Sequence, residues 1–218
     1  MALRQPSSMQ NYTDLGFKKI KTPPAVWKLI QEFWEKNKHN RMPENWPKGN
    51  TYVNHWDSPT YMVSVEDSKL RGGGHIIKQA IWDAAKDTIQ EWTGEELTEC
   101  SLYGIRVYTE GATLATHVDR LPLVSSAIVN VAQDVDEPWP IEVYGHDGKA
   151  YNVTMEPGEM VLVSTYLSFL DSIYSSCIDD KDNDTGNSNC NDTGNSNSNN
   201  SSCILLANCN LKLDNILV

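Results

Sequence analysis

Residues 108–131 read YTEGATLATHVDRLPLVSSAIVNV, and they place His117 and Asp119 two positions apart at the start of an apolar run. On a β-strand, residues i and i+2 project to the same face. An imidazole nitrogen and a carboxylate oxygen could therefore reach one metal ion while Val118 points away. The spacing predicts a candidate metal site built on a strand.

The same spacing has another interpretation, in which His117 is solvated and Asp119 caps a local turn. A second His-x-Asp pattern, His55-Trp56-Asp57, lies in NHWDSP among turn residues with no strand to orient both side chains. For that second pair we expect no shared pocket. For His117 and Asp119, the metal interpretation depends on the surrounding sequence.

The first hundred residues contain two helical patterns. In KTPPAVWKLIQEFWEKNKH (21–39), Thr22 is a plausible N-cap and Pro23 fits the first turn. In GGGHIIKQAIWDAAKDTIQEWTG (72–94), Gly94 stands where a C-terminal stop is expected. The predicted apolar faces consist of Val26, Ile30, Phe33 and Asn37 in the first helix, and of Ile77, Ala80, Ile81, Ala84, Thr88 and Trp92 in the second.

From Ser101 onward the hydrophobic period changes to two. Short β-rich runs separated by turn residues follow one another, and GHDG at 145–148 is the clearest hairpin turn among them. Such a series predicts an antiparallel sandwich or barrel.

After about Tyr166 the composition changes again. NDTGNSN occurs at 183–189 and again at 191–197, and this repeat is too polar to offset the entropy of ordering the chain. We therefore predict a disordered C-terminal tail over residues 166–218.

The overall composition limits the partners. The chain of 218 residues has a net charge of −11 and a pI near 4.8, which argues against a nucleic-acid partner because polyanion binding depends on basic residues. There is no apolar h-region of a secretory signal at the start and no apolar run long enough to span a bilayer. The default expectation is a soluble intracellular protein, and the sequence leaves the compartment unknown.

With these motifs in order, the chain resembles the 2-oxoglutarate- and Fe(II)-dependent dioxygenases, specifically their prolyl 4-hydroxylase-like branch. The resemblance covers roughly residues 103–163, through VYTEGATLATHVDR, VSSAIVNV and VTMEPGEMVLV. It implies an α+β fold in which N-terminal helices (1–100) support a double-stranded β-helix, or jelly roll. That core (101–165) is incomplete and precedes the tail (166–218).

The resemblance also implies a site and its cofactors. His117 and Asp119 match two of the three iron ligands, since two histidines and one carboxylate form the facial triad of non-haem Fe(II) oxygenases. Tyr108 matches a tyrosine that often contacts 2-oxoglutarate, and Asn130 lies where a pocket-facing polar side chain is common. The implied cofactors are Fe(II), 2-oxoglutarate and ascorbate, and the implied reaction is hydroxylation of a protein side chain. The substrate itself is not identified.

The second half of the family's site is not found. After PGEMVLV the family continues to a distal histidine and a basic residue that anchors 2-oxoglutarate, whereas this chain continues STYLSFLDSIYSSCIDD. The last histidine is His146, in the predicted hairpin turn, and no arginine follows Arg120. The C-terminal end of the catalytic domain thus looks missing or replaced, as by misprediction or missplicing. Two functions follow: a dioxygenase, or a catalytically inactive family member acting at most as a binding module.

Overall fold

The computed structural model describes residues 13–45, 59–109, 112, 117, 119 and 123–164, together with the backbones of three strands further along the chain. The fold is α+β. Its elements within these ranges, in chain order, are β1 (Phe17–Lys21), α2 (Pro24–Asn37), β2 (Met42–Pro43), β3 (Thr60–Ser64), α3 (His75–Thr93), β4 (Leu97–Ser101), β5 (Gly104–Thr109), β6 (Leu123–Asp134), β7 (Ile141–Tyr144), β8 (Ala150–Val153), β9 (Glu159–Ser164), β10 (Leu170–Ser172), β11 (Ser202–Leu206) and β12 (Cys209–Leu213).

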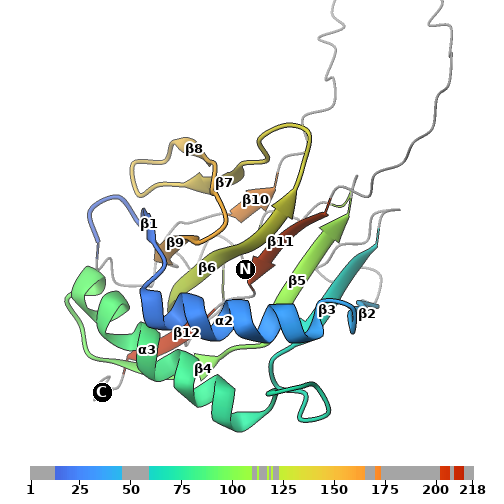
Figure 1. Ribbon diagram of the computed structural model, residues 1–218. Coiled ribbons are helices and arrows are strands. Elements are labelled where there is room, and N and C mark those ends of the chain that lie inside the picture. The colour runs from blue at the N-terminus through green and yellow to red at the C-terminus, as the bar shows by residue number, and fades with distance from the viewer. Residues whose placement is uncertain are drawn as a thin grey trace, which may run out of the picture.

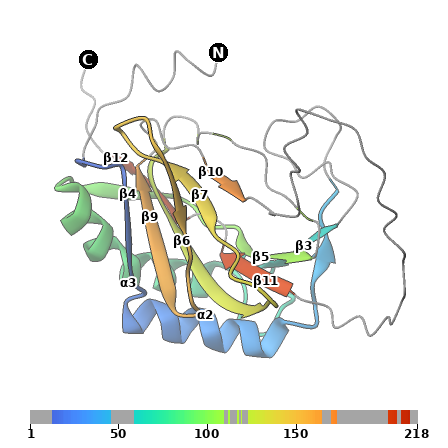
Figure 2. The same ribbon diagram turned by 90° about the horizontal axis from the view of Figure 1, so that it is seen from above.

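The elements form three layers. The large sheet has the order β1-β9-β6-β11-β5-β3-β2, with β12 pairing with β4 and β6, and the small sheet has the order β10-β7-β8. Figure 1 shows α2 and α3 across one face of the large sheet, and Figure 2 shows the small sheet on its other side. Two hydrophobic clusters separate these layers, one between the helices and the large sheet and one between the two sheets.

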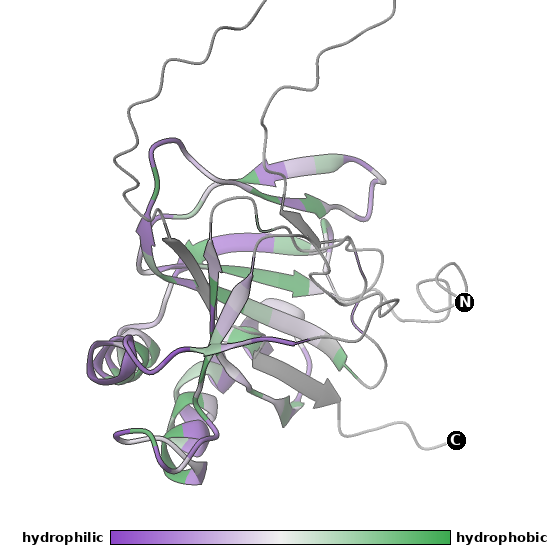
Figure 3. Ribbon diagram, turned by 90° about the vertical axis from the view of Figure 1, so that its right-hand side faces the viewer, coloured by the Kyte–Doolittle hydropathy of each residue, from purple (hydrophilic) through white to green (hydrophobic). Residues whose placement is uncertain are grey.

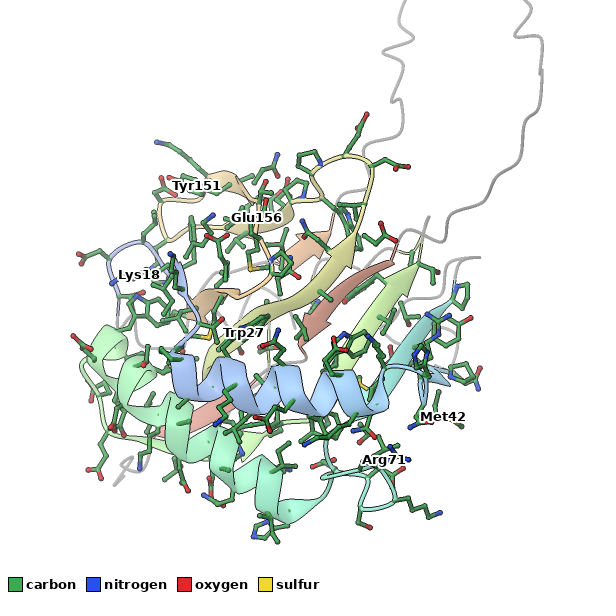
Figure 4. All side chains as sticks on the ribbon, in the orientation of Figure 1. Lys18, Trp27, Met42, Arg71, Tyr151 and Glu156 are labelled. Atoms are coloured by element: carbon green, nitrogen blue, oxygen red, sulfur yellow. The ribbon has the colours of Figure 1, made fainter. Side chains whose placement is uncertain are left out.

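Both predicted helices are present, and Figure 3 shows both hydrophobic and hydrophilic residues on each of them. In α2 the buried face includes Val26, Ile30 and Phe33, as the spacing predicts. Trp27 lies at the start of α2 (Figure 4), where an added Cβ on Gly158 would contact its ring. The predicted Thr22 cap is not found, because no side chain caps this helix.

The buried face of α3 is rotated slightly about the helix axis relative to the predicted face. Gly94 follows the helix with φ 74°, a left-handed conformation that glycine adopts without a Cβ clash. Ile81 is fully buried as predicted, and Ile77, Ala84 and Trp92 are partly buried against the core, but the fully buried stripe continues through Ala85 and Ile89. Packing against α2 and the sheet selected this neighbouring face, which is almost as apolar. None of the helices in the described ranges is long and apolar enough to cross a membrane.

The strands after residue 101 follow the predicted period of two. On β6, Ala127 and Val129 join the cluster under the helices, whereas Ile128 joins the cluster between the sheets. The β7–β8 hairpin turns at 145–148, where the Gly148 N–H donates to the Gly145 carbonyl at 2.9 Å. At the start of β5, a Cβ on Gly104 would lie 2.3 Å from the Val63 carbonyl oxygen, so only glycine permits this close approach.

Three strands fall in the segment 166–218 for which the sequence predicts disorder. The backbone of β10 pairs with β7, and β11 and β12 pair with consecutive halves of β6 while also pairing with β5 and β4. Disorder is therefore not the state of these stretches, and the repeat at 183–197 lies outside the described residues. The physical reason is that β6, twelve residues long, would otherwise present an unpaired edge inside the sheet.

A buried ion pair joins β5 to the segment that follows β2. The Arg106 guanidinium donates from Nε and Nη2 to the two oxygens of Glu44, at 2.7 and 2.9 Å, and the side chains are 19% and 8% exposed. Burial lowers the pKa of Arg106, but the nearby Tyr108 side chain and the Glu44 carboxylate raise it, and the net pKa lies above the ordinary value. Arg106 therefore stays charged and depends on Glu44 for compensation.

Removal of the last two strands should destabilise the whole sheet. Deleting residues 202–218 would leave β6 and β5 with bare edges, so we expect a thermal unfolding midpoint lower by more than about 10 °C and increased association. The control is deletion of one repeat copy, residues 183–190, which should leave the midpoint within about 2 °C. Equal midpoints for the full chain and the 202–218 deletion, measured by circular dichroism, would show that β11 and β12 contribute nothing.

Loss of one partner of the buried ion pair should cost far more than loss of an exposed one. Glu44→Ala leaves the Arg106 charge uncompensated, and we expect the free energy of unfolding to fall by roughly 3–5 kcal/mol. In the exposed Lys36–Glu32 pair of α2, with a 3.7 Å separation, Glu32→Ala should change it by less than about 1 kcal/mol. Urea unfolding of both variants measures the difference, and similar losses would contradict the buried pair's structural role.

Candidate metal centre

The structure brings His117 and Asp119 together at the large sheet. The His117 Nε2 atom lies 3.9 Å from Oδ1 of Asp119, and each side chain is 9% exposed. The other carboxylate oxygen, Oδ2, accepts a hydrogen bond of 2.5 Å from the hydroxyl of Ser126, which is buried in the middle of β6. The two oxygens of Asp119 thus have different neighbours: one contacts the sheet, and the other faces the imidazole.

This geometry fits two ligands of one metal ion. With metal–ligand distances of about 2.0–2.2 Å, ligands at right angles around an ion lie roughly 3 Å apart, and ligands on opposite sides lie roughly 4 Å apart. The 3.9 Å between Nε2 and Oδ1 is too long for a hydrogen bond. A shift of less than about 1 Å by either side chain would bring both atoms into adjacent coordination positions.

A third protein ligand is not found among the described residues. No group of three or more histidine, cysteine, aspartate or glutamate side chains that could hold a metal occurs in that part of the chain. His39 and His75 are exposed, and the His55–Asp57 pair lies outside the described ranges. His146 sits in the β7–β8 turn as predicted, where its Nδ1 lies 2.8 Å from the Thr13 carbonyl oxygen and its ring covers Gly16.

Tyr108 lies between the two sheets. It is 2% exposed and belongs to the cluster that also contains Ile128 and Val143. Its ring makes an edge-to-face contact with Trp139, with centroids 5.4 Å apart, and a hydrogen bond with its side chain is one cause of the raised pKa of Arg106. Tyr108 thus contacts an aromatic ring and lies close to the Arg106 guanidinium.

Asn130 is also buried between the sheets, at 3% exposure, but the structure limits what it can bind. Its amide nitrogen donates to the Met155 carbonyl at 2.8 Å and to Oε1 of Gln133 at 2.6 Å. A carbonyl only accepts hydrogen bonds, so the first contact fixes which amide atom is nitrogen. Oδ1 is buried without a hydrogen-bond partner. Asn130 thus offers a ligand an acceptor, and a carboxylate finds no donor there.

Sequence reasoning missed several residues that shape the site. Ser126 lies in the quoted run VSSAIVN, and its same-face spacing with Ile128 and Asn130 could have identified it. Trp139 follows the acidic residues of QDVDEPWP. Asp134, Asp136 and Glu137 are exposed, whereas Trp139 packs against the intersheet cluster. Glu44 and Arg106 lie 62 residues apart, so no local sequence pattern indicates that they pair.

Comparison with family models and with curated proteins found no match. Solved structures, in contrast, resemble this one over nearly the whole chain. An oxidoreductase of the 2OG-Fe(II) oxygenase family from Burkholderia pseudomallei aligns with a TM-score of 0.55 and 10% identity, covering 97% of this chain and 91% of that one.

Two prolyl hydroxylases give a similar result. One, from Trichoplax adhaerens in complex with a peptide of the hypoxia inducible factor oxygen degradation domain, has a TM-score of 0.54 and 8% identity, covering 98% of this chain and 88% of that one. The prolyl-4-hydroxylase of Pseudomonas putida has a TM-score of 0.50 and 11% identity, covering 97% and 96%. At the level of the fold, the predicted resemblance is confirmed: the chain has the architecture of the prolyl 4-hydroxylase-like 2-oxoglutarate- and Fe(II)-dependent oxygenases.

Proposed function

We propose that this chain is built on the scaffold of a 2-oxoglutarate- and Fe(II)-dependent dioxygenase that hydroxylates a protein side chain. In this proposal it retains the proximal half of the metal site, either as an active dioxygenase or as a metal-binding module. The observation that carries the proposal is the His117–Asp119 pair, whose Nε2 and Oδ1 atoms lie 3.9 Å apart at the sheet interior. In such enzymes, bound iron and 2-oxoglutarate supply the oxidising power. The residues of this chain contribute binding and orientation.

In this proposal His117 and Asp119 hold the iron, and Tyr108 contacts 2-oxoglutarate. The fit to the complete cofactor set is partial. Two donors are in place, but the described residues contain no third one. The sequence after His146 holds no further histidine, and its only basic residues are Lys149, Lys181 and Lys212.

Among the described residues, the groups expected to bind 2-oxoglutarate are also incomplete. Arg106 is a buried cation close to Tyr108, yet both oxygens of Glu44 already compensate its charge. Asn130, which the resemblance places in the pocket, offers an acceptor rather than a donor. A dicarboxylate co-substrate would lose the charge-assisted pairing that normally fixes it.

A second candidate function is therefore a non-catalytic metal-binding module that keeps the oxygenase fold. The absence of a third ligand among the described residues favours this candidate. The two candidates agree on His117 and Asp119 and differ only on turnover. For the polypeptide as it stands, we favour the second: weak metal binding without conversion of 2-oxoglutarate.

The test combines metal binding with turnover. We expect the purified full chain to bind Co(II), used as a probe for Fe(II), weakly and through His117 and Asp119. Loss of a third protein ligand should reduce metal affinity by more than the roughly 10–100-fold that supporting residues contribute. His117→Ala and Asp119→Ala should each abolish the binding measured by titration calorimetry. With Fe(II), ascorbate and 2-oxoglutarate, no succinate above background is expected.

His75→Ala and His146→Ala serve as controls, since the first histidine is exposed and the second lies in the hairpin turn. Both should bind Co(II) like the unaltered chain. Succinate production that disappears in His117→Ala would prove the enzyme active, and its loss in His146→Ala as well would identify the third ligand. Co(II) binding that survives both His117→Ala and Asp119→Ala would overturn the proposed site.

A further inference from the structure

Ser126 occupies a position where a hydroxyl is costly unless it has a partner. It is 1% exposed, and its backbone is paired on both sides, opposite Val163 of β9 and Asn210 of β12. Its side chain lies on the same face of β6 as Ile128, which belongs to the apolar intersheet cluster. Burying a hydroxyl among such residues is unfavourable without a hydrogen bond.

The partner of this hydroxyl is Asp119. Ser126 Oγ donates to Oδ2 at 2.5 Å, within the range of about 2.5–2.7 Å for a charge-assisted bond from a hydroxyl to a carboxylate. Asp119 itself is not part of any helix or strand, whereas Ser126 lies on β6, an inner strand of the large sheet. The hydrogen bond therefore restrains the Asp119 carboxylate by tying it to the rigid sheet.

The bond also decides which oxygen is presented to the ion. With Oδ2 held by Ser126, Oδ1 is the oxygen that faces His117 Nε2 at 3.9 Å. We infer that Ser126 is a positioning residue, which holds Asp119 as a ligand that binds through one oxygen and pre-orients the two-ligand site for a divalent cation. This inference rests on the proposed function and adds a residue to which that proposal gives no role.

The effect of Ser126 on cation affinity should be large in this chain because few protein ligands contribute to orienting the ion. In a site with three or more protein ligands, a loosely held carboxylate is oriented partly by the others. Here, the described residues supply two, so disorder of one carboxylate removes half of the organisation of the site. Residues that orient metal ligands typically contribute about 10–100-fold in affinity.

The neighbouring Ser125 provides a matched control. It is 0% exposed, and its hydroxyl donates to the Val163 carbonyl at 3.4 Å. Its side chain projects to the opposite face of β6, the side of Ala127 and Val129 under the helices. Ser125→Ala and Ser126→Ala thus remove the same atom from adjacent, equally buried positions, and only the second removes a contact with Asp119.

The experiment measures Co(II) affinity by titration calorimetry and the Co(II) absorption spectrum for the full chain and its variants. Ser126→Ala should weaken Co(II) binding by about 10–100-fold. Its spectrum should also change, because the released carboxylate can bind the ion through both oxygens. Ser125→Ala should keep the affinity and the spectrum of the unaltered chain. Ser126→Thr, which retains the hydroxyl, should restore most of the affinity. Circular dichroism of each variant reports whether it is folded.

The experiment distinguishes a failure of the inference about Ser126 from a failure of the proposed function. If the unaltered chain and His117→Ala behave alike toward Co(II), the metal site itself is wrong, and the role of Ser126 fails with it. If the unaltered chain binds Co(II) through His117 and Asp119 while folded Ser126→Ala matches it in affinity and spectrum, the inference alone is overturned. The same follows if Ser125→Ala weakens binding as much as Ser126→Ala does.

Discussion

Strand β6 has both faces buried over most of its length and is paired on both edges over residues 125–127, and this enclosure is the constraint on which the rest of the structure depends. One edge pairs with β9, and the other pairs with β12 and then β11 along the length of the strand. One face meets the helices and the other meets the small sheet. The fixed backbone of β6 is what allows a single hydroxyl, that of Ser126, to locate Asp119 outside the sheet.

The same strand also explains the polarity of the interior. Ile128 is apolar, but Ser126 and Asn130, two residues to either side, carry polar groups toward the intersheet layer. Each has a hydrogen bond that fixes its orientation, to Asp119 in one case and to the Met155 carbonyl in the other. Satisfied polar groups of this kind are compatible with a buried layer, whereas the unpartnered Oδ1 of Asn130 costs about 1–3 kcal/mol unless a ligand or water donates to it.

Local periodicity was enough to predict the elements that are amphipathic on their own. Both helices and the strands from β5 to β9 follow from spacing and turn residues. The strand expected to carry both His117 and Asp119 is not among the elements, because Asp119 lies outside any strand, although the two side chains are still 3.9 Å apart. Contacts between distant segments could not be predicted in this way. The pairing of β11 and β12 with β6 depends on an edge formed about seventy residues earlier, and short runs such as ILL and LKL beside a polar repeat give little indication of a core strand.

Resemblance to an enzyme family implies both metal binding and turnover, but these two properties depend on different groups in the protein. In the proposed function, metal binding depends on His117 and Asp119, which lie 3.9 Å apart, and on the Ser126 hydroxyl that holds Asp119. Turnover needs in addition a complete ligand set and a cation available to the co-substrate. Arg106 is charged and buried near Tyr108, but its bidentate pairing with Glu44 satisfies that charge within the protein. Releasing Arg106 for a ligand would leave Glu44 as an uncompensated buried carboxylate, which costs several kcal/mol. The bidentate pairing with Glu44 therefore holds the Arg106 charge within the protein, and an anionic ligand would have to compete with Glu44 for it.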